Sequence, residues 1–352
     1  MKKLLAVLTA AALLGSALAG CSKAPAKEPE PAENSGTSEE TQGEDSQEEE
    51  KEPAGSGYKV AFTVPTMNNP FFVDQIAGAQ KAADERGIEL LTVGADNAVN
   101  QQIEQIEDYI TQNVDGMIVH AVDTTGIVTG IEALNEAGIP VVTTAEKPTG
   151  GVVTCAVTWD NYQDGYSAGK YIAEALGGEG KVCELSGVAG QQSSREKSQG
   201  FQDAIAEYPK MELLASQPAE FDRAKAMSAM ENFLQSFDVI DAVYASNDEM
   251  ALGAIQAIKA EGRMEEIFVM GNDGTADAIQ AIEAGEMAVS NATPPFLQGY
   301  CAVDMMYRAL KGEEIPDTII EQSTIITKEN LDEADHILFG VDEEDWYWVK
   351  QF

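Results

Sequence analysis

From residue 58 onward, short runs of Val, Ile and Leu alternate with segments whose apolar residues are spaced as on a helix. The runs predict strands over residues 58–64, 87–93, 116–120 and 139–143. Between them the spacing is helical, at Ile103, Ile106 and Ile110 and then at Ile127, Ile131 and Leu134. Strands that alternate with helices form βαβ units, so the pattern predicts a parallel sheet covered by helices on both faces.

The same pattern starts again at Gly180. Strands are predicted over residues 181–185, 211–216, 241–245, 267–270 and 287–291. Helices are predicted over residues 195–207, 223–236, 248–260 and 275–284. The fold class is therefore α/β, with two doubly wound, Rossmann-like lobes of parallel sheet and a boundary near residues 159–162.

Residues 1–20 have the layout of a secretory signal peptide. Lys2 and Lys3 precede an apolar stretch over residues 4–14, which is too short for a spanning helix. The signal ends in Leu18-Ala19-Gly20, directly before Cys21, and this ending resembles a bacterial lipobox. The resemblance implies cleavage before Cys21 and a lipid, palmitate included, on that residue. A chance run of small residues before a cysteine is the alternative.

Residues 22–57 form an acidic segment with eleven acidic residues against three lysines. The segment contains no aromatic residue and no Val, Ile, Leu or Met. Such a composition buries too little apolar surface to offset the entropy of ordering, and its like charges keep it extended. We therefore expect residues 21–57 to be a lipidated cysteine followed by a disordered tether.

The charge balance excludes several functions. With 22 Lys+Arg against 60 Asp+Glu, the formal net charge is −38, and so acidic a surface repels a nucleic-acid backbone. No apolar run beyond the N-terminus is long enough to span a bilayer. Two histidines and four cysteines are too few for a typical clustered metal site, so neither a metal nor a cofactor is expected. Cys155, Cys183 and Cys301 are expected to be buried thiols, and one disulfide with a free thiol is the alternative.

Polar and aromatic residues gather just after the predicted strands, where open α/β sheets bind their ligands. They are Asn69, Phe71, Phe72, Glu146, Arg195, Phe221, Asn247 and Asp273. Aromatic rings cover the C–H face of a sugar, while amide, carboxylate and guanidinium groups pair with its hydroxyls. The set therefore predicts a site for a neutral, polyhydroxylated ring.

Some of these residues also have a purely structural interpretation. Asn69 before Pro70 is a good helix N-cap with proline at the first helical position. Asp273 before Gly274 is an ordinary turn pair, and Arg195 is equally compatible with a surface position. The shared location after strands favours the ligand-binding interpretation.

Several sequence strings resemble the ribose-binding proteins of the type I periplasmic binding family. They are Thr66-Met67-Asn68-Asn69-Pro70-Phe71-Phe72, Ser216-Gln217-Pro218-Ala219-Glu220-Phe221-Asp222-Arg223, Asn247-Asp248-Glu249-Met250-Ala251-Leu252-Gly253 and Gly271-Asn272-Asp273-Gly274-Thr275. The resemblance covers roughly residues 58–330 and implies two lobes joined by a multi-strand hinge. It implies a first lobe of residues 58–159 plus about 294–322, and a second of residues 160–293 plus about 323–352.

The resemblance also carries over the sugar contacts of the family. They fall on Asn69, Phe71, Phe72, Arg195, Phe221, Asn247 and Asp273. Ribose binders have an Asp-Arg pair where this chain has Ala145-Glu146, and a Gln where it has Thr293. We count Glu146 and Thr293 as candidate contacts, with Glu146 either accepting from ligand hydroxyls or pairing with Arg195. A substrate that carries a positive charge is a further alternative. These departures leave the sugar-binder class intact but argue against ribose itself.

Trp159 adds bulk beside the hinge, where packing and ligand stacking are both open. The aromatic tail at residues 342–348 is expected to pack on its own lobe, with a partner surface as the alternative.

The expected function is that of the substrate-binding lipoprotein of a carbohydrate ABC importer. It would be a monomer, lipid-anchored outside the cytoplasm, that presents a monosaccharide or polyol to a membrane permease. The alternative is an extracellular sensor of the same fold that feeds a chemoreceptor or a sensor kinase. An enzyme is not expected, because the chain has no Gly-x-Ser-x-Gly elbow, metal-binding His pair or phosphate loop.

Overall fold

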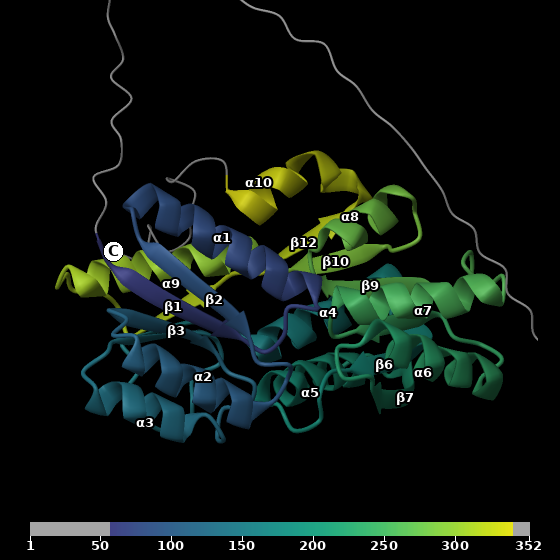
Figure 1. The fold of residues 1–352 in the computed structure, drawn as a ribbon. Coiled ribbons are helices and arrows are strands. Elements are labelled where there is room, and N and C mark those ends of the chain that lie inside the picture. Colours follow the sequence, from purple (N-terminus) through teal and green to yellow (C-terminus); the bar gives the residue numbers. More distant parts are fainter. Residues whose placement is uncertain (1–56, 341–352) are drawn as a thin grey trace, which may run out of the picture. The chain divides into compact units, whose positions relative to one another are not determined.

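The computed structural model describes residues 57–340, which form two six-stranded sheets (Figure 1). All neighbours in the first sheet are parallel. In spatial order its strands are β11 (Thr318–Glu321), β5 (Cys155–Trp159), β4 (Val141–Ala145), β3 (Gly116–His120), β1 (Lys59–Val64) and β2 (Glu89–Gly94). The predicted signal peptide, Cys21, the tether and the aromatic tail lie outside the described residues.

The second sheet is parallel except at one edge, where β12 runs antiparallel to β10. In spatial order its strands are β12 (Thr324–Thr327), β10 (Val289–Ala292), β9 (Phe268–Asp273), β8 (Ala242–Ala245), β6 (Glu179–Ser186) and β7 (Lys210–Pro218).

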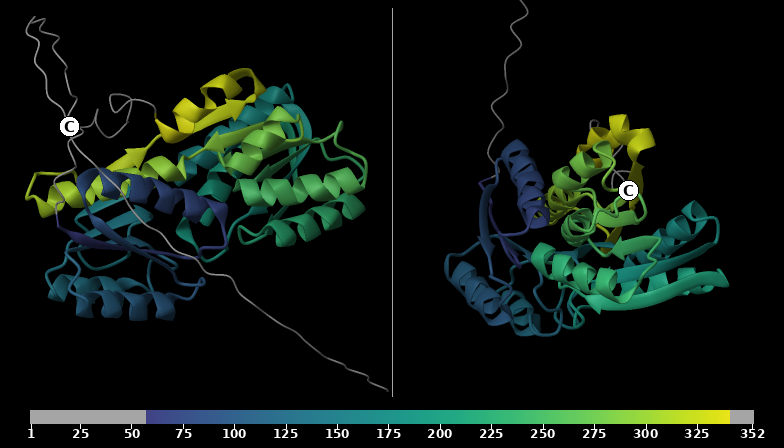
Figure 2. Two further views of the ribbon diagram at one scale, coloured as in Figure 1. Left: turned by 45° about the horizontal axis from the view of Figure 1, so that its top comes forward. Right: turned by 90° about the vertical axis from the view of Figure 1, so that its right-hand side faces the viewer.

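Helices cover both faces of each sheet (Figure 2). The first sheet packs against α1 (Pro70–Arg86) and α9 (Pro295–Leu310) on one face, and against α2 (Val99–Thr111) and α3 (Val128–Glu136) on the other. The second sheet packs against α4 (Asn161–Ala175) and α5 (Gln192–Ala206) on one face, and against α6 (Arg223–Ser236) and α7 (Asp248–Ala260) on the other. Three further helices complete the described chain: α8 (Ala276–Glu283), the 3₁₀ helix η1 (Lys328–Glu333) and α10 (Ala334–Phe339).

The prediction of two doubly wound α/β lobes is thereby confirmed. We call each sheet with its covering helices a lobe. The described chain passes between the sheets after β5, after β10 and after β11. Three crossings of this kind form a hinge at one end of both sheets, and the residue limits of the lobes stay a prediction.

Several elements of the described chain have no counterpart in the predicted pattern, namely the strands β5, β11 and β12 and the helices α4, α9, η1 and α10. β11 and β12 have four residues each, and such short strands are defined by their hydrogen-bonded neighbours rather than by their own periodicity. The second strand also begins later than predicted. Gly87 caps α1 with φ of 62°, so extended backbone starts only at Glu89.

Two glycines allow the helices of each lobe to touch. A Cβ on Gly299 of α9 would lie 1.8 Å from the carbonyl oxygen of Gln75 in α1. A Cβ on Gly165 of α4 would lie 1.9 Å from the carbonyl oxygen of Lys197 in α5. Any side chain at these positions would force the helices apart, so glycine sets how closely Lys197 approaches α4.

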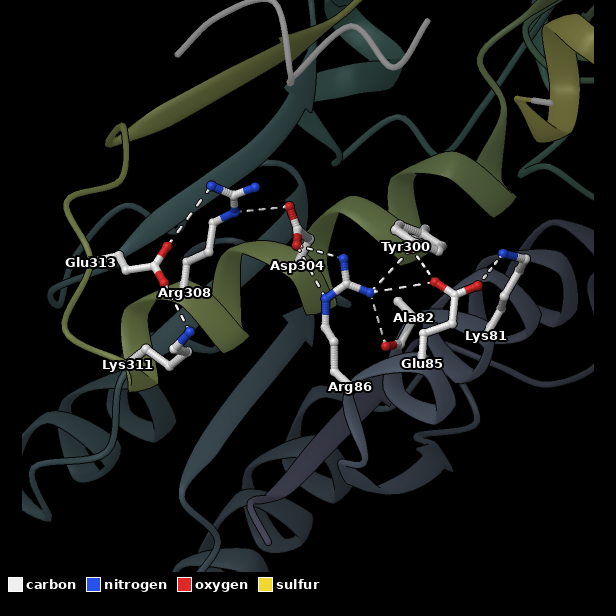
Figure 3. A network of polar contacts seen from close by, with 9 residues as sticks. All are labelled: Lys81, Ala82, Glu85, Arg86, Tyr300, Asp304, Arg308, Lys311 and Glu313. Atoms are coloured by element: carbon white, nitrogen blue, oxygen red, sulfur yellow. Dashed lines mark hydrogen bonds and ion pairs between the residues drawn. The ribbon is translucent and has the colours of Figure 1, made fainter. Parts of the chain in front are cut away.

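A polar network joins α1 to α9 at the end remote from Asn69 (Figure 3). Arg86 Nη2 lies 2.6 Å from Asp304 Oδ1, and Arg86 Nη1 donates to the hydroxyl of Tyr300 at 3.1 Å. Tyr300 in turn donates to Glu85 of α1. Since Arg86 and Asp304 are largely buried, the network fixes the register of the two helices.

The three cysteines of the described chain are buried, as predicted. Burial raises the pKa of Cys155 and of Cys183 to about 12, which keeps both thiols protonated and unreactive. Among residues 57–340, no helix has both the length and the apolar character needed to cross a membrane. The same residues contain no group of three or more His, Cys, Asp or Glu side chains that could hold a metal ion.

Candidate ligand-binding site

The first lobe contributes an aromatic cluster made of Phe71, Phe72 and Trp159. Phe71 meets Phe72 edge-to-face with ring centroids 5.2 Å apart, and it meets Trp159 at 5.9 Å. Ala145, at the end of β4, packs into the same cluster. Ring contacts of this geometry hold the three side chains in fixed orientations where the strands of the lobe end.

Trp159 both packs and offers a donor. The side chain is only 8% exposed, and its Nε1 has no hydrogen-bond partner within residues 57–340. A buried indole N–H normally finds a partner, so this donor is available to a ligand. Trp159 packs beside Ala145, where the resemblance to ribose binders implies an Asp-Arg pair.

Asn69 has the predicted capping role. Its Oδ1 accepts from the backbone N–H of Phe71 at 2.9 Å, and Pro70 occupies the first helical position. The cap fixes the start of α1 and therefore the direction in which Phe71 and Phe72 leave it. The Nδ2 group of Asn69 remains free to donate to a ligand, so a contact there stays a prediction.

His120 closes the aromatic cluster on its other side. Its ring lies 4.9 Å from that of Phe72, and its Nδ1 is 3.3 Å from Oε1 of Gln75. Burial lowers the pKa of His120 to about 3, so the imidazole is neutral at physiological pH. His120 therefore contributes shape and one hydrogen bond to this region rather than charge.

The pKa of His120 makes stability depend on pH. In the unfolded chain its pKa is about 6.5, so acid protonates the unfolded state first. Relative to His120→Asn, we expect the wild-type protein to lose free energy of unfolding as pH falls from 7 to 5, by up to about 1.4 kcal/mol per pH unit below pH 6.5. Urea unfolding of both proteins at pH 5, 6 and 7 measures this. A difference that does not change with pH would contradict a depressed pKa.

The second lobe contributes Asp248 and Asp273, which have different surroundings. Asp248 starts α7 and accepts four hydrogen bonds, from Gly274 N, Thr275 N, Thr275 Oγ1 and Ser290 Oγ. Burial raises its pKa to about 6, and these donors act in the opposite direction. Asp248 therefore holds in place the turn that follows β9.

Asp273 is the last residue of β9 and has φ of 127°, a region that favours glycine. It is 5% exposed, and within the described chain its Oδ1 accepts from Asn272 Nδ2 at 3.3 Å. The same Asn272 amide donates to Thr293 Oγ1 at 3.3 Å. Burial raises the pKa of Asp273 well above its usual value, and the charge of Asp248 raises it further. The structure thus brings together Asp273 and the predicted contact Thr293.

Asn247 and Phe221 complete the predicted set on this lobe. Asn247 caps α7 by accepting from Met250 N at 2.9 Å, which leaves its Nδ2 free to donate to a ligand. Phe221 follows β7 with φ of 57°, and its ring lies so close to Gly187 that a Cβ there would be 2.0 Å from Cζ. Gly187 thereby makes room for an aromatic ring at the end of β6.

The structure does not bring Arg195 to these residues. Its side chain is exposed, and its Nη1 donates to the carbonyl oxygen of Gly190 at 2.6 Å. Lys197, two residues later, is 7% exposed, and its charge lowers the pKa of both Asp164 and Asp273. Lys197 is therefore a buried cation of α5 within electrostatic range of Asp164 and Asp273.

The sequence contained a signal for Lys197. The buried residues of α5 include Ser194, Lys197, Phe201 and Ile205, which are spaced as on one helical face. Counting back four residues from Phe201 reaches Lys197 rather than Arg195.

Glu146 links the two lobes. Its Oε1 accepts from the backbone N–H of Ser193, at the start of α5, at 2.5 Å. A second contact runs from Gln191 Nε2 to the carbonyl oxygen of Val122 at 3.4 Å. The carboxylate of Glu146 complements the positive end of the helix dipole. Neither an ion pair between Glu146 and Arg195 nor a free Glu146 side chain is seen in the described chain.

Comparisons with known proteins agree with this geometry. The periplasmic binding protein domain family matches residues 60–314. The ribose import binding protein of Bacillus subtilis (strain 168) is 40% identical over 271 residues, which cover 76% of this chain and 88% of that protein. The ribose import binding protein of Escherichia coli (strain K12) is 38% identical over 256 residues, with 73% and 86% covered.

Two solved structures of binding proteins have a similar fold. A periplasmic solute binding protein of an ABC transporter from Actinobacillus succinogenes 130z, with bound D-allose, has a TM-score of 0.76 and 27% identity. The similarity covers 78% of this chain and 99% of that one. A solute binding protein from Bacillus halodurans C-125, with bound myo-inositol, has a TM-score of 0.74 and 31% identity, with 78% and 96% covered.

Fold and site define a two-lobed α/β binding protein whose aromatic and polar residues meet where strands end. The chain belongs to the periplasmic binding protein family, as a type I, ribose-binding-like member. The relatives are binding proteins rather than enzymes, which confirms the expectation that this chain is not an enzyme.

Proposed function

We propose that the protein is the substrate-binding component of a carbohydrate ABC importer, taking up one monosaccharide or related polyol between its lobes. The observation that carries this proposal is that the two lobes contribute side chains of different chemistry. The first lobe offers the aromatic cluster of Phe71, Phe72 and Trp159, while the second offers Asp273 and Lys197. Aromatic rings bind the C–H face of a sugar and the polar groups bind its hydroxyls.

The names of the two similar ribose binders favour a role in import over a role in sensing. The two similar ribose binders are called import binding proteins, and the two solved structures with bound D-allose and myo-inositol belong to ABC transporters. The ligands named there are ribose, allose and myo-inositol, all of them polyhydroxylated rings. Ala145 and Glu146 stand where ribose binders have an Asp-Arg pair, and Thr293 stands where they have a Gln, so we propose a sugar other than ribose.

We propose that the two lobes close around the ligand when it binds. The bond from Ser193 N to Glu146 joins the two lobes, and separating them would break it. A ligand that contacts both lobes binds this closed arrangement better than an open one and therefore shifts the population toward it. The closed form would then dock on a membrane permease.

We further propose that the mature protein is a monomer held at the outer face of the membrane by a lipid on Cys21. The basis is the signal-like start and the Leu18-Ala19-Gly20 sequence before Cys21. A Cys21→Ala variant should move from the membrane fraction to the soluble fraction of fractionated cells. Equal membrane association of both proteins would count against the anchor.

The ligand class is tested by thermal unfolding. Purified protein is unfolded and refolded to remove bound ligand, then melted with a panel of pentoses, hexoses, polyols and their amino derivatives. A ligand at a hundredfold excess over its dissociation constant stabilises by roughly 2.7 kcal/mol, which raises the melting temperature by several degrees. The Asn247→Ala variant, which lacks one donor at the site, should show a smaller shift with the same ligand. If no compound moves the melting temperature of folded protein, the carbohydrate proposal fails.

A further inference from the structure

The second lobe buries two carboxylates that the described chain satisfies only in part. Hydrogen bonds from Ser323 and Asn291 lower the pKa of Asp164, but one of its oxygens is left without a partner. Asp164, in the first turn of α4, is 4% exposed, and its Oδ2 has no hydrogen-bond partner in the described chain. Asp273 accepts a long bond from Asn272, and a hydrogen bond from the backbone of Asp248 lowers its pKa. Within residues 57–340, neither carboxylate has an ion-pair partner within 4.0 Å. Asp248 differs, because its four donors already satisfy it.

Lys197 is the cation that acts on both of these carboxylates. Burial raises the pKa of Asp164 and of Asp273, and the charge of Lys197 partly offsets this in each case. Two buried carboxylates therefore face one ammonium, and an uncompensated buried charge costs several kcal/mol.

Neighbouring buried groups also lack partners. The hydroxyl of Tyr244 and the Oδ1 of Asn161 are buried with no hydrogen-bond partner in the described chain. Burial raises the pKa of Tyr244, and the charges of Glu184, Asp164 and Asp273 raise it further, so its hydroxyl lies within electrostatic reach of Asp164 and Asp273. Native proteins leave few buried polar groups unpaired. This set of buried polar groups is therefore suited to bind a ligand that carries several hydrogen-bond donors.

A metal ion does not fit here, since the described chain has no cluster of three or more metal-ligating side chains. An organic ammonium fits better. Trp159 and Asp164 flank the same crossing between the lobes, five residues apart, and Trp159 packs against Phe71. Aromatic faces attract ammonium groups, and so do buried carboxylates.

We propose that the ligand is a polyhydroxylated ring that carries a protonated amine, such as an amino sugar or an aminocyclitol, and that Asp164 and Asp273 receive the ammonium. The inference rests on the proposed function and narrows its substrate class. With the ligand bound, two carboxylates face two ammonium groups and the buried charge is balanced. The ring hydroxyls then contact the free amide groups of Asn69 and Asn247.

The test is calorimetric titration of the refolded protein with matched compounds. Each set holds an amine and its hydroxyl counterpart, for example D-glucosamine and D-glucose, extended to amino pentoses and aminocyclitols, with N-acetyl-D-glucosamine as the uncharged amide. We expect at least one amine to bind tenfold or more tightly than its hydroxyl and amide counterparts. Asp164→Asn should remove that preference, because it removes the charge and keeps the shape.

Asp203→Asn is the matched control. Asp203 lies on α5 and accepts from the exposed Tyr162 hydroxyl, so this variant removes the same charge from the same lobe away from the site. It should keep the full preference for the amine. If a neutral sugar binds as tightly as every amine, the inference is overturned while the sugar-binding proposal stands. If an amine is preferred equally by wild type and Asp164→Asn, the role of Asp164 is overturned. If folded protein binds nothing in any set, both proposals fail.

Discussion

Replacing Asp248 with alanine is expected to lower the free energy of unfolding by about 3–5 kcal/mol. The reason is the number of donors that lose their acceptor. The backbone N–H of Thr275 is left without a partner, the N–H of Gly274 keeps only Ser290 Oγ at 3.0 Å, and all of these groups are buried. Each buried donor without a partner costs about 1–3 kcal/mol. Urea unfolding monitored by circular dichroism measures the change.

Asp248→Asn separates hydrogen bonding from packing. The amide keeps the shape, its oxygen can accept from Gly274 and Thr275, and its nitrogen can donate to the Ser290 hydroxyl. We therefore expect this variant to lose less than half of what the alanine variant loses. A loss below 1 kcal/mol in Asp248→Ala would show that the turn after β9 is held by other contacts.

Asp273→Ala is expected to weaken binding of the protein's ligand by at least a hundredfold. The carboxylate lies at the end of β9, where its partners are Asn272 and the backbone of Asp248, so part of its accepting capacity is free for a ligand. Hydrogen bonds to a buried charge contribute about 1.5–3 kcal/mol each, and two of them correspond to a factor of a hundred or more. Calorimetric titration with the compound found in the thermal panel gives the affinity.

Arg195→Ala serves as the control for this comparison. The guanidinium is exposed and bonds only its own loop at Gly190, so we expect affinity within twofold of wild type. If Arg195→Ala binds as poorly as Asp273→Ala, Arg195 contacts the ligand and the assignment of Lys197 as the cation of the site is wrong. Unfolding curves of both variants should confirm that each is folded.

Lys197 and Arg195 show where sequence reasoning was insufficient. Both are cations near the start of a predicted helix, and the resemblance to ribose binders favoured Arg195. The helix of the structure begins at Gln192, and its buried face is set by Phe201 and Ile205. Close contact with Gly165 brings that face against α4, so the packing of two helices decides which cation is buried.

Glu146 is a second residue whose contact could not be predicted from the sequence. Its position after a strand suggested a ligand contact or a pair with Arg195. In the structure its carboxylate accepts a hydrogen bond from the backbone N–H of Ser193, which is 47 residues away in the sequence and lies in the other lobe. A partner of this kind has no side-chain signature, because every residue except proline has a backbone N–H.

The sequence by itself determined the α/β class, the two doubly wound lobes and the gathering of polar and aromatic residues after strands. These features follow from the period of apolar residues and from a general property of parallel sheets, and both are local. The short strands β11 and β12, the burial of Lys197 and the unpaired Asp164 Oδ2 and Trp159 Nε1 of the described chain depended on tertiary structure. Those depend on which distant segments pack together, and burial and unmet hydrogen bonds exist only after that packing.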